Sequence, residues 1–212
     1  MKPARRASGR TGVVLLALVV AAIAGYVVRG LAVTPNPSDT SPEAGFARDM
    51  IIRHAQAVEM AEIVRSRTKD RLIRSLATDI VLTHQSQIGR LAGWLDIWGL
   101  PATWIEEPIT WMGHPITGRM PGMATEAQVR ALGTLPVDRM DVRFLQWMIP
   151  HHQAAVLMAD DIATRTTRPE IANLAAGMSN SQLAEVDYMR ALLLQRGAPE
   201  TEPPVSMPGS AT

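Results

Sequence analysis

The fold is decided by Phe144-Leu-Gln-Trp-Met-Ile-Pro-His-His-Gln-Ala-Ala-Val-Leu-Met158, which has helical spacing and combines two histidines with two methionines. A related stretch lies earlier, at Phe46-Ala-Arg-Asp-Met-Ile-Ile-Arg-His-Ala-Gln-Ala-Val-Glu-Met60. Matching residues recur 98 positions later for Phe46, Met50, His54, Ala57, Val58 and Met60 of that stretch, and for Ala61 directly after it. The chain therefore contains a diverged internal duplication.

Working outward, each copy predicts a helical hairpin. Ser41 and Pro42 are typical of a helix start, and that helix should run to about residue 67. Further helices are expected over about 69–98, 138–165 and 169–196, with a short one from Thr125 to about Gly133 opened by a capping box. Two such hairpins pack most simply as an all-α antiparallel four-helix bundle.

The segments around the bundle differ in composition. A basic start and an apolar run over 12–28 predict a membrane anchor, a single transmembrane helix within 1–33, or an export signal. The predicted organisation is 1–33 anchor or signal, 34–42 linker, 43–198 helical bundle and 199–212 disordered tail, with the bundle divided into repeat one at 46–98, a loop at 99–124 and repeat two at 138–196. The bundle should then lie outside the cytoplasm, tethered to the membrane or secreted if the signal is cleaved.

Composition removes several classes of function. A formal net charge of +1 lacks the basic bias of nucleic-acid-binding proteins, and no glycine-rich phosphate loop for a nucleotide cofactor is present. Cysteine is absent, so disulfides, thiolate metal sites and cysteine nucleophiles are excluded. Any soft metal ligand must therefore be methionine.

The histidines and methionines predict a metal site. Positions four apart share a helix face, so Met50 lies near His54 and Met148 near His152. Imidazole and thioether together favour copper, and thioethers suit Cu(I) in particular. The candidate ligands are His151, His152, Met148, Met158, His54, Met50, Met60, His84, Met120, Met123 and His114.

Other interpretations stay open. Methionine also fills gaps in cores, and a lone histidine such as His84 or His114 is more often structural. A second hypothesis is a membrane-proximal interaction module, in which the loop around Trp104, Trp111 and Met112 contacts a partner. A copper-dependent redox enzyme is a third, although none of the five histidines has a glutamate three positions before it, as di-iron bundles require.

Three stretches, 120–125 (Met-Pro-Gly-Met-Ala-Thr), 144–159 and 182–186, carry a resemblance to a known family. In these stretches the chain resembles the DUF305 family of exported or membrane-anchored bacterial proteins. The resemblance implies a ferritin-like helical bundle and copper binding or copper tolerance outside the cytoplasm, with a metal ion, the membrane and a copper-handling protein as partners. The implied ligands are Met148, His151, His152 and Met158, with Met120 and Met123 less directly.

The first repeat departs from this pattern. Arg53 occupies the place of His151, and a cation there would oppose a bound metal. A second intact site is therefore not expected. His54, Met50 and Met60 are expected instead to complete one site shared across the bundle.

Overall fold

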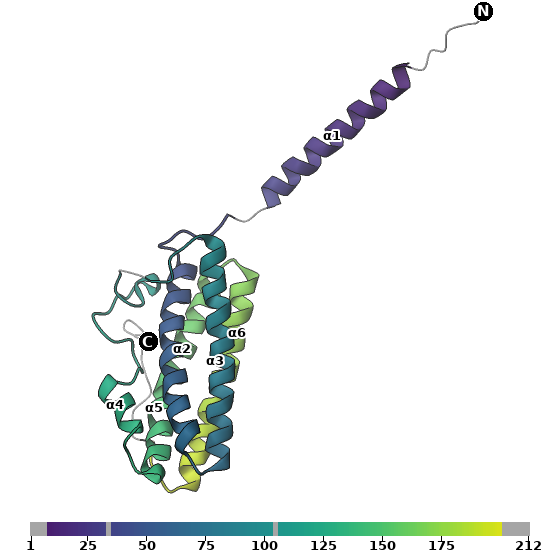
Figure 1. Ribbon diagram of the computed structural model, residues 1–212. Coiled ribbons are helices and arrows are strands. Elements are labelled where there is room, and N and C mark those ends of the chain that lie inside the picture. The colour runs from purple at the N-terminus through teal and green to yellow at the C-terminus, as the bar shows by residue number, and fades with distance from the viewer. Residues whose placement is uncertain (1–7, 33–34, 104–105, 201–212) are drawn as a thin grey trace, which may run out of the picture. The chain divides into compact units, whose positions relative to one another are not determined.

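The computed structural model describes residues 8–32, 35–103 and 106–200, and every regular element in these ranges is a helix (Figure 1). The chain divides into two units, residues 1–36 and 37–212. The first unit contains α1 (Ser8–Ala32). In the described part of the chain, no helix is long and apolar enough to cross a membrane, so the predicted transmembrane anchor is unsupported.

The second unit is a helical bundle. It contains α2 (Pro42–Arg67), α3 (Arg71–Trp98), the short 3₁₀ helix η1 (Thr110–Met112), α4 (Glu126–Leu132), α5 (Val137–Arg165) and α6 (Pro169–Gln195). Helices α2 and α3 form one hairpin, and α5 and α6 form the other. The two hairpins meet chiefly through α2 and α5, whereas α3 and α6 approach each other only sparsely.

The helix ends follow the signals in the sequence. The Ser41 hydroxyl accepts a hydrogen bond from the Ala44 N–H at 3.2 Å, and Pro42 begins α2. Thr125 and Gln128 form the predicted capping box of α4, because each side chain accepts from the other residue's N–H. Gly99 ends α3 in the left-handed conformation with φ 71°.

The apolar core is divided into two clusters. An upper cluster includes Phe46, Met50, Ala155 and Met158, and a lower cluster includes Ala57, Met60, Phe144 and Met148. Members of each duplicated pair therefore lie in opposite clusters: Phe46 is above and Phe144 is below. This exchange is the result expected if an axis perpendicular to the helices relates the two hairpins.

Polar residues occupy the level at which each helix passes from one cluster to the other. The level is marked by His54 in α2, His84 in α3, His151 and His152 in α5, and Gln182 in α6, all of them buried. We call the four histidines the histidine layer. It interrupts the apolar core at its middle.

The loop after α3 is packed against α2 rather than extended into solvent. The Trp111 indole N–H donates to Asp49 Oδ2 at 2.9 Å, and the ring meets Phe46 edge-on at 5.7 Å. A Cβ at position 45 would lie 2.6 Å from Cδ1 of Trp111, so glycine there permits the close approach. The expectation of an exposed loop is wrong for Trp111 and Met112, which are buried, while Trp104 lies outside the described residues.

The structure describes two residues of the predicted tail, Pro199 and Glu200. The Pro199 carbonyl accepts from Gln146 Nε2 at 2.8 Å, and Glu200 pairs with Arg190 at 2.9 Å. These two residues are thus held against the bundle. The predicted disorder of 201–212, and parts of the predicted leader (1–7 and 33) and linker (34), lie outside the described residues.

Candidate metal site

The histidine layer is a continuous set of ring contacts. The centroids of His54 and His84 are 4.3 Å apart, those of His84 and His152 are 5.3 Å apart, and those of His151 and His152 are 6.0 Å apart. Three helices supply the rings, and each ring is at most 1% exposed. The fold thus gathers four of the five histidines at one point.

Most of the ring nitrogens in this layer are unpartnered. Both nitrogens of His54, His84 and His151, together with Nδ1 of His152, are buried without a hydrogen bond in the described structure. The amide of Gln182 and Oε1 of Gln87 are also buried without a hydrogen bond. Buried polar groups are normally paired, and each exception costs about 1–3 kcal/mol. A ligand that binds to the lone pairs of these rings would offset part of that cost.

Burial keeps the imidazoles of His54, His84 and His151 neutral. It lowers the pKa of His54 to about 3, and the neighbouring His152 contributes in the same direction while Gln87 opposes it. Burial also brings the pKa of His84 and of His151 well below the usual value, helped by the adjacent histidines. A neutral imidazole has a lone pair available without losing a proton, which is the form that binds metals.

His152 is oriented by a carboxylate. Its Nε2 lies 2.5 Å from Oε2 of Glu185, which is itself only 17% exposed. In the neutral ring this hydrogen bond places the proton on Nε2 and leaves the lone pair on Nδ1. A carboxylate behind a histidine fixes its tautomer and direction, as is typical of metal-binding histidines.

Arg53 lies beside the layer, and after burial its charge is a further cause that lowers the pKa values of His54 and His151. One terminal nitrogen donates to the His151 carbonyl at 3.0 Å and the other to the Pro121 carbonyl at 2.6 Å. Burial lowers its pKa to about 10, with Asp49 acting in the opposite direction, so it is a cation at neutral pH. The equivalent residues of the two repeats, Arg53 and His151, thus contact each other directly.

Residues 43–193 match the family model described as "Domain of unknown function (DUF305)". This chain belongs to the DUF305 family. A candidate secreted DUF305 protein from Streptomyces coelicolor has a solved structure similar to this DUF305 protein, with 46% identity and a TM-score of 0.74 over 78% of this chain and all of that one. A second relative, "Uncharacterized protein L153" of Acanthamoeba polyphaga mimivirus, is 39% identical over 56 residues, which are 26% of this chain and 37% of that protein.

Solved structures with bound metals also resemble this DUF305 protein. The Cu(I)-bound form of CopM is 27% identical with a TM-score of 0.55, covering 74% of this chain and 97% of that one. CopM has also been solved with Cu(II) and with silver. The similarity therefore extends to proteins that carry soft metal ions.

The predicted methionine ligands of this DUF305 chain separate into two groups. Met50 and Met158 lie in the upper apolar cluster, and Met60 and Met148 lie in the lower one, all fully buried. They therefore flank the histidine layer from both sides. Met120 is buried in the upper cluster, Met123 packs against it, and His114 is exposed in the loop after η1, away from the other histidines.

The donor set fits a soft cation better than a hard one. Among the residues described, no three His, Asp or Glu side chains are grouped closely enough to hold a metal ion. Cu(I) accepts thioethers beside imidazole, and methionine is flexible enough to reach inward from an apolar cluster.

Four residues around the layer are not among the ligands predicted from the sequence, namely Gln87, Gln182, Glu185 and Met178. Met178 is fully buried in α6, and Glu185 lies against His152 of α5. The placement of all four depends on how the helices pack together, which periodicity along one helix does not reveal.

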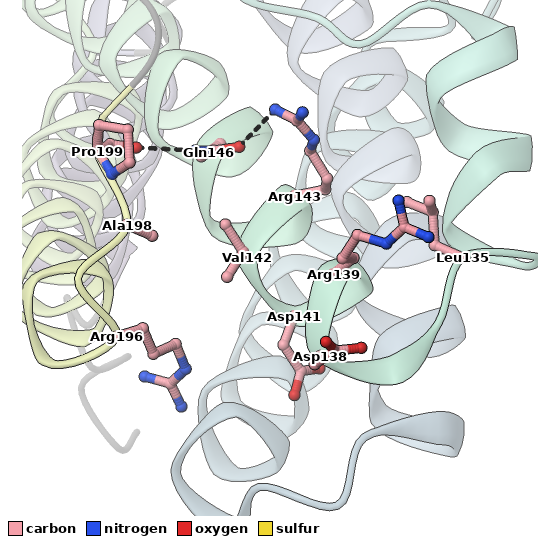
Figure 2. Close-up of a pocket in the computed structure, with 10 residues that line it drawn as sticks. All are labelled: Leu135, Asp138, Arg139, Asp141, Val142, Arg143, Gln146, Arg196, Ala198 and Pro199. Atoms are coloured by element: carbon pink, nitrogen blue, oxygen red, sulfur yellow. Dashed lines mark hydrogen bonds between the residues drawn. The ribbon is translucent and has the colours of Figure 1, made fainter.

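A larger pocket of about 760 Å³ lies elsewhere, between the start of α5 and the end of α6 (Figure 2). Its walls carry charges of both signs, including Asp141, Arg139 and Arg196. The Thr68 hydroxyl donates to Asp141 Oδ2 at 2.8 Å, while Oδ1 is buried without a partner and burial raises the pKa of this carboxyl. None of the layer histidines lines this pocket, so it is separate from the candidate metal site.

Proposed function

We propose that this DUF305 protein binds a soft monovalent cation, Cu(I), at the histidine layer and holds or passes it on outside the cytoplasm. The observation that carries the proposal is the set of seven buried ring nitrogens without partners at the centre of the bundle. An apolar core of this size gains nothing from such groups unless something binds them. His151 and His152 are the primary ligands, supported by His54 and His84.

Redox and acid chemistry support this choice of cargo. Thioethers need not lose a proton to bind a metal, and neither do imidazoles that burial keeps neutral. The chain has no cysteine that an oxidising environment could cross-link. A set of histidine and methionine ligands can therefore hold copper under conditions that would disable a thiolate site.

Similarity to known proteins supports both the metal and the location. CopM binds Cu(I), Cu(II) and silver with the same general fold. The Streptomyces coelicolor relative is described as a candidate secreted protein, and this chain begins with basic residues followed by an apolar run over 12–28. We therefore assign the cation-binding bundle to the outside of the cytoplasmic membrane, reached by export.

A competition titration tests the proposal. The full chain is titrated with Cu(I) against a chelator of known affinity, with zinc in parallel, followed by native mass spectrometry. We expect one tight, copper-selective site, and a loss of more than about a hundredfold in affinity for the double variant His151→Ala/His152→Ala, since removing ligands should exceed the loss from altering a supporting residue.

The matched control is His114→Ala, because that histidine is exposed in the loop and outside the layer. This variant should bind Cu(I) as tightly as the parent. Circular dichroism must show that the double variant is still helical. Equal affinity in a folded double variant and in the parent would refute the assignment.

A further inference from the structure

A groove lies between α3 and α6, next to the histidine layer. It has a volume of about 620 Å³, and the residues that matter for the argument are Thr83, Ser86 and Gln87 of α3 with Gly177, Met178 and Ser181 of α6. Ser86 and Gly177 are exposed at its rim, whereas Met178 is fully buried. The groove therefore leads from solvent toward the core.

Two of its lining residues connect it to the metal site. Gln87 lies one turn after His84 and has a buried Oε1 for which the structure gives no hydrogen-bond partner. Met178 lies one turn before Gln182, whose amide is also buried and unpartnered. A thioether and an amide oxygen thus stand between the groove and the histidine layer.

On another side of the layer, a buried cation is held by backbone carbonyls. There the Arg53 guanidinium is fully buried and is held on the carbonyls of His151 and Pro121. The loop is pressed against α5, because a Cβ at Gly122 would lie 2.2 Å from the Pro150 carbonyl oxygen. In the α3–α6 groove the rim cation is Arg90, and its guanidinium carbon lies 5.6 Å over the Trp94 ring.

We propose that the α3–α6 groove is the route by which the cation reaches the histidine layer, with Met178 and Gln87 as its first ligands. The inference rests on the proposed function and specifies how that site is loaded. The transfer is a ligand exchange: the cation leaves the Met178 sulfur as it binds an unpartnered ring nitrogen of His84. No electron is transferred and no proton has to leave, because both donors are neutral.

The test is to plug the groove. A Cβ at Gly177 meets no atom within 4 Å, so Gly177→Leu extends into the groove, and it also replaces glycine inside a helix with a better helix former. The matched control is Gly89→Leu, in α3, which also has free space around it but does not line the groove. Loading of Ag(I) into the full chain is followed by time-resolved native mass spectrometry.

Gly177→Leu should load at least about tenfold more slowly than the parent, with its equilibrium affinity unchanged, because a steric plug slows binding and release alike. Gly89→Leu should load at the parent rate. Loading of Gly177→Leu at the parent rate would place the route elsewhere and overturn the proposal.

A second measurement separates this inference from the function on which it rests. The methionine methyl groups are labelled with ¹³C, and Ag(I) is added to the parent, to His84→Ala/His152→Ala and to Met178→Leu. The Met178 methyl resonance should shift in His84→Ala/His152→Ala, because silver stays on the Met178 sulfur when transfer to His84 is blocked. If the parent lacks tight binding, the proposed function fails; if the Met178 methyl does not shift in His84→Ala/His152→Ala, the groove proposal fails.

Discussion

The two hairpins descend from one pattern, yet they contribute differently to the layer at which they meet. The first supplies His54, His84 and the cation Arg53, and the second supplies His151 and His152, with Glu185 behind the latter. At the position of His84 the second hairpin has Gln182. Equivalent residues of the two repeats approach the layer from opposite ends of the bundle. A substitution in one repeat therefore need not displace the equivalent residue of the other. The comparison teaches that duplication here produced one composite histidine layer rather than two equal ones.

The largest expected effect is a loss of stability in acid, caused by the buried imidazoles that the two hairpins contribute. The folded-state pKa values of His54, His84 and His151 lie below the ordinary value of 6.5, so their contribution to stability is present above pH 6.5 and is lost as pH falls toward about 3, the folded pKa of His54. Each histidine should cost about 1.4 kcal/mol per pH unit in that window. The metal-free protein should therefore unfold in mild acid, as denaturant titrations at several pH values would measure.

Leucine variants measure how much of this pH dependence of stability each hairpin contributes. His54→Leu/His84→Leu should remove about two thirds of the pH dependence and His151→Leu about one third, since the three groups contribute similarly. His114→Leu, at the exposed histidine, serves as the control and should leave the slope unchanged. A slope that does not respond to the layer variants would mean that other groups cause the acid sensitivity.

Phe46→Ala and Phe144→Ala compare how much the upper and the lower cluster contribute to the free energy of unfolding. Both rings are fully buried, but Phe46 lies in the upper cluster and Phe144 in the lower one. Each substitution should lower the free energy of unfolding by about 3–5 kcal/mol, the usual cost of truncating a buried phenylalanine. Urea unfolding of both variants checks this, and a much smaller loss for either would show that its cluster can collapse around the cavity.

Gly122→Ala tests the contact that the loop makes with only one of the hairpins. Pro150 is covered by the loop, whereas its equivalent in the first repeat, Ile52, is 52% exposed. Gly122 has φ 74°, and the added Cβ would collide with the Pro150 carbonyl, so we expect a loss of about 2–4 kcal/mol. Thermal unfolding measures it, with Ile52→Ala as the near-neutral comparison. An unaffected melting temperature would show that this contact does not hold the loop.

The smallest effect concerns the cation that distinguishes the first hairpin. Arg53→Lys keeps the charge, but a single ammonium cannot reproduce the fork that reaches both carbonyls. The loss of one charge-assisted hydrogen bond should cost about 1.5–3 kcal/mol in urea unfolding. Arg130→Lys, at an exposed pair with Glu126, should change stability by less than about 0.5 kcal/mol. Equal effects at the two sites would contradict a specific role for the Arg53 fork.

Much of the fold could be predicted because helix limits are local. Pro42, the Thr125 capping box and Gly99 are read from neighbouring residues, and the observed bounds agree with those signals. Burial of Trp111 could not be predicted in this way, because it depends on Asp49, 62 positions earlier, and on the missing side chain of Gly45. The same reason applies to the site. The gathering of His54, His84 and His152 follows from bundle geometry, whereas the contact of Arg53 with the Pro121 carbonyl depends on a loop with no periodic signal.

The polar layer has a consequence for how the bundle unfolds. Cooperativity within a domain depends on continuous apolar contact, and here that contact is divided between an upper and a lower cluster with unpaired rings between them. In the empty protein the two ends can open as partly independent units. A cation bound between the two clusters would link them, so that the free energy of binding makes the unfolding of the two ends more cooperative. Hydrogen exchange at both ends would then slow together.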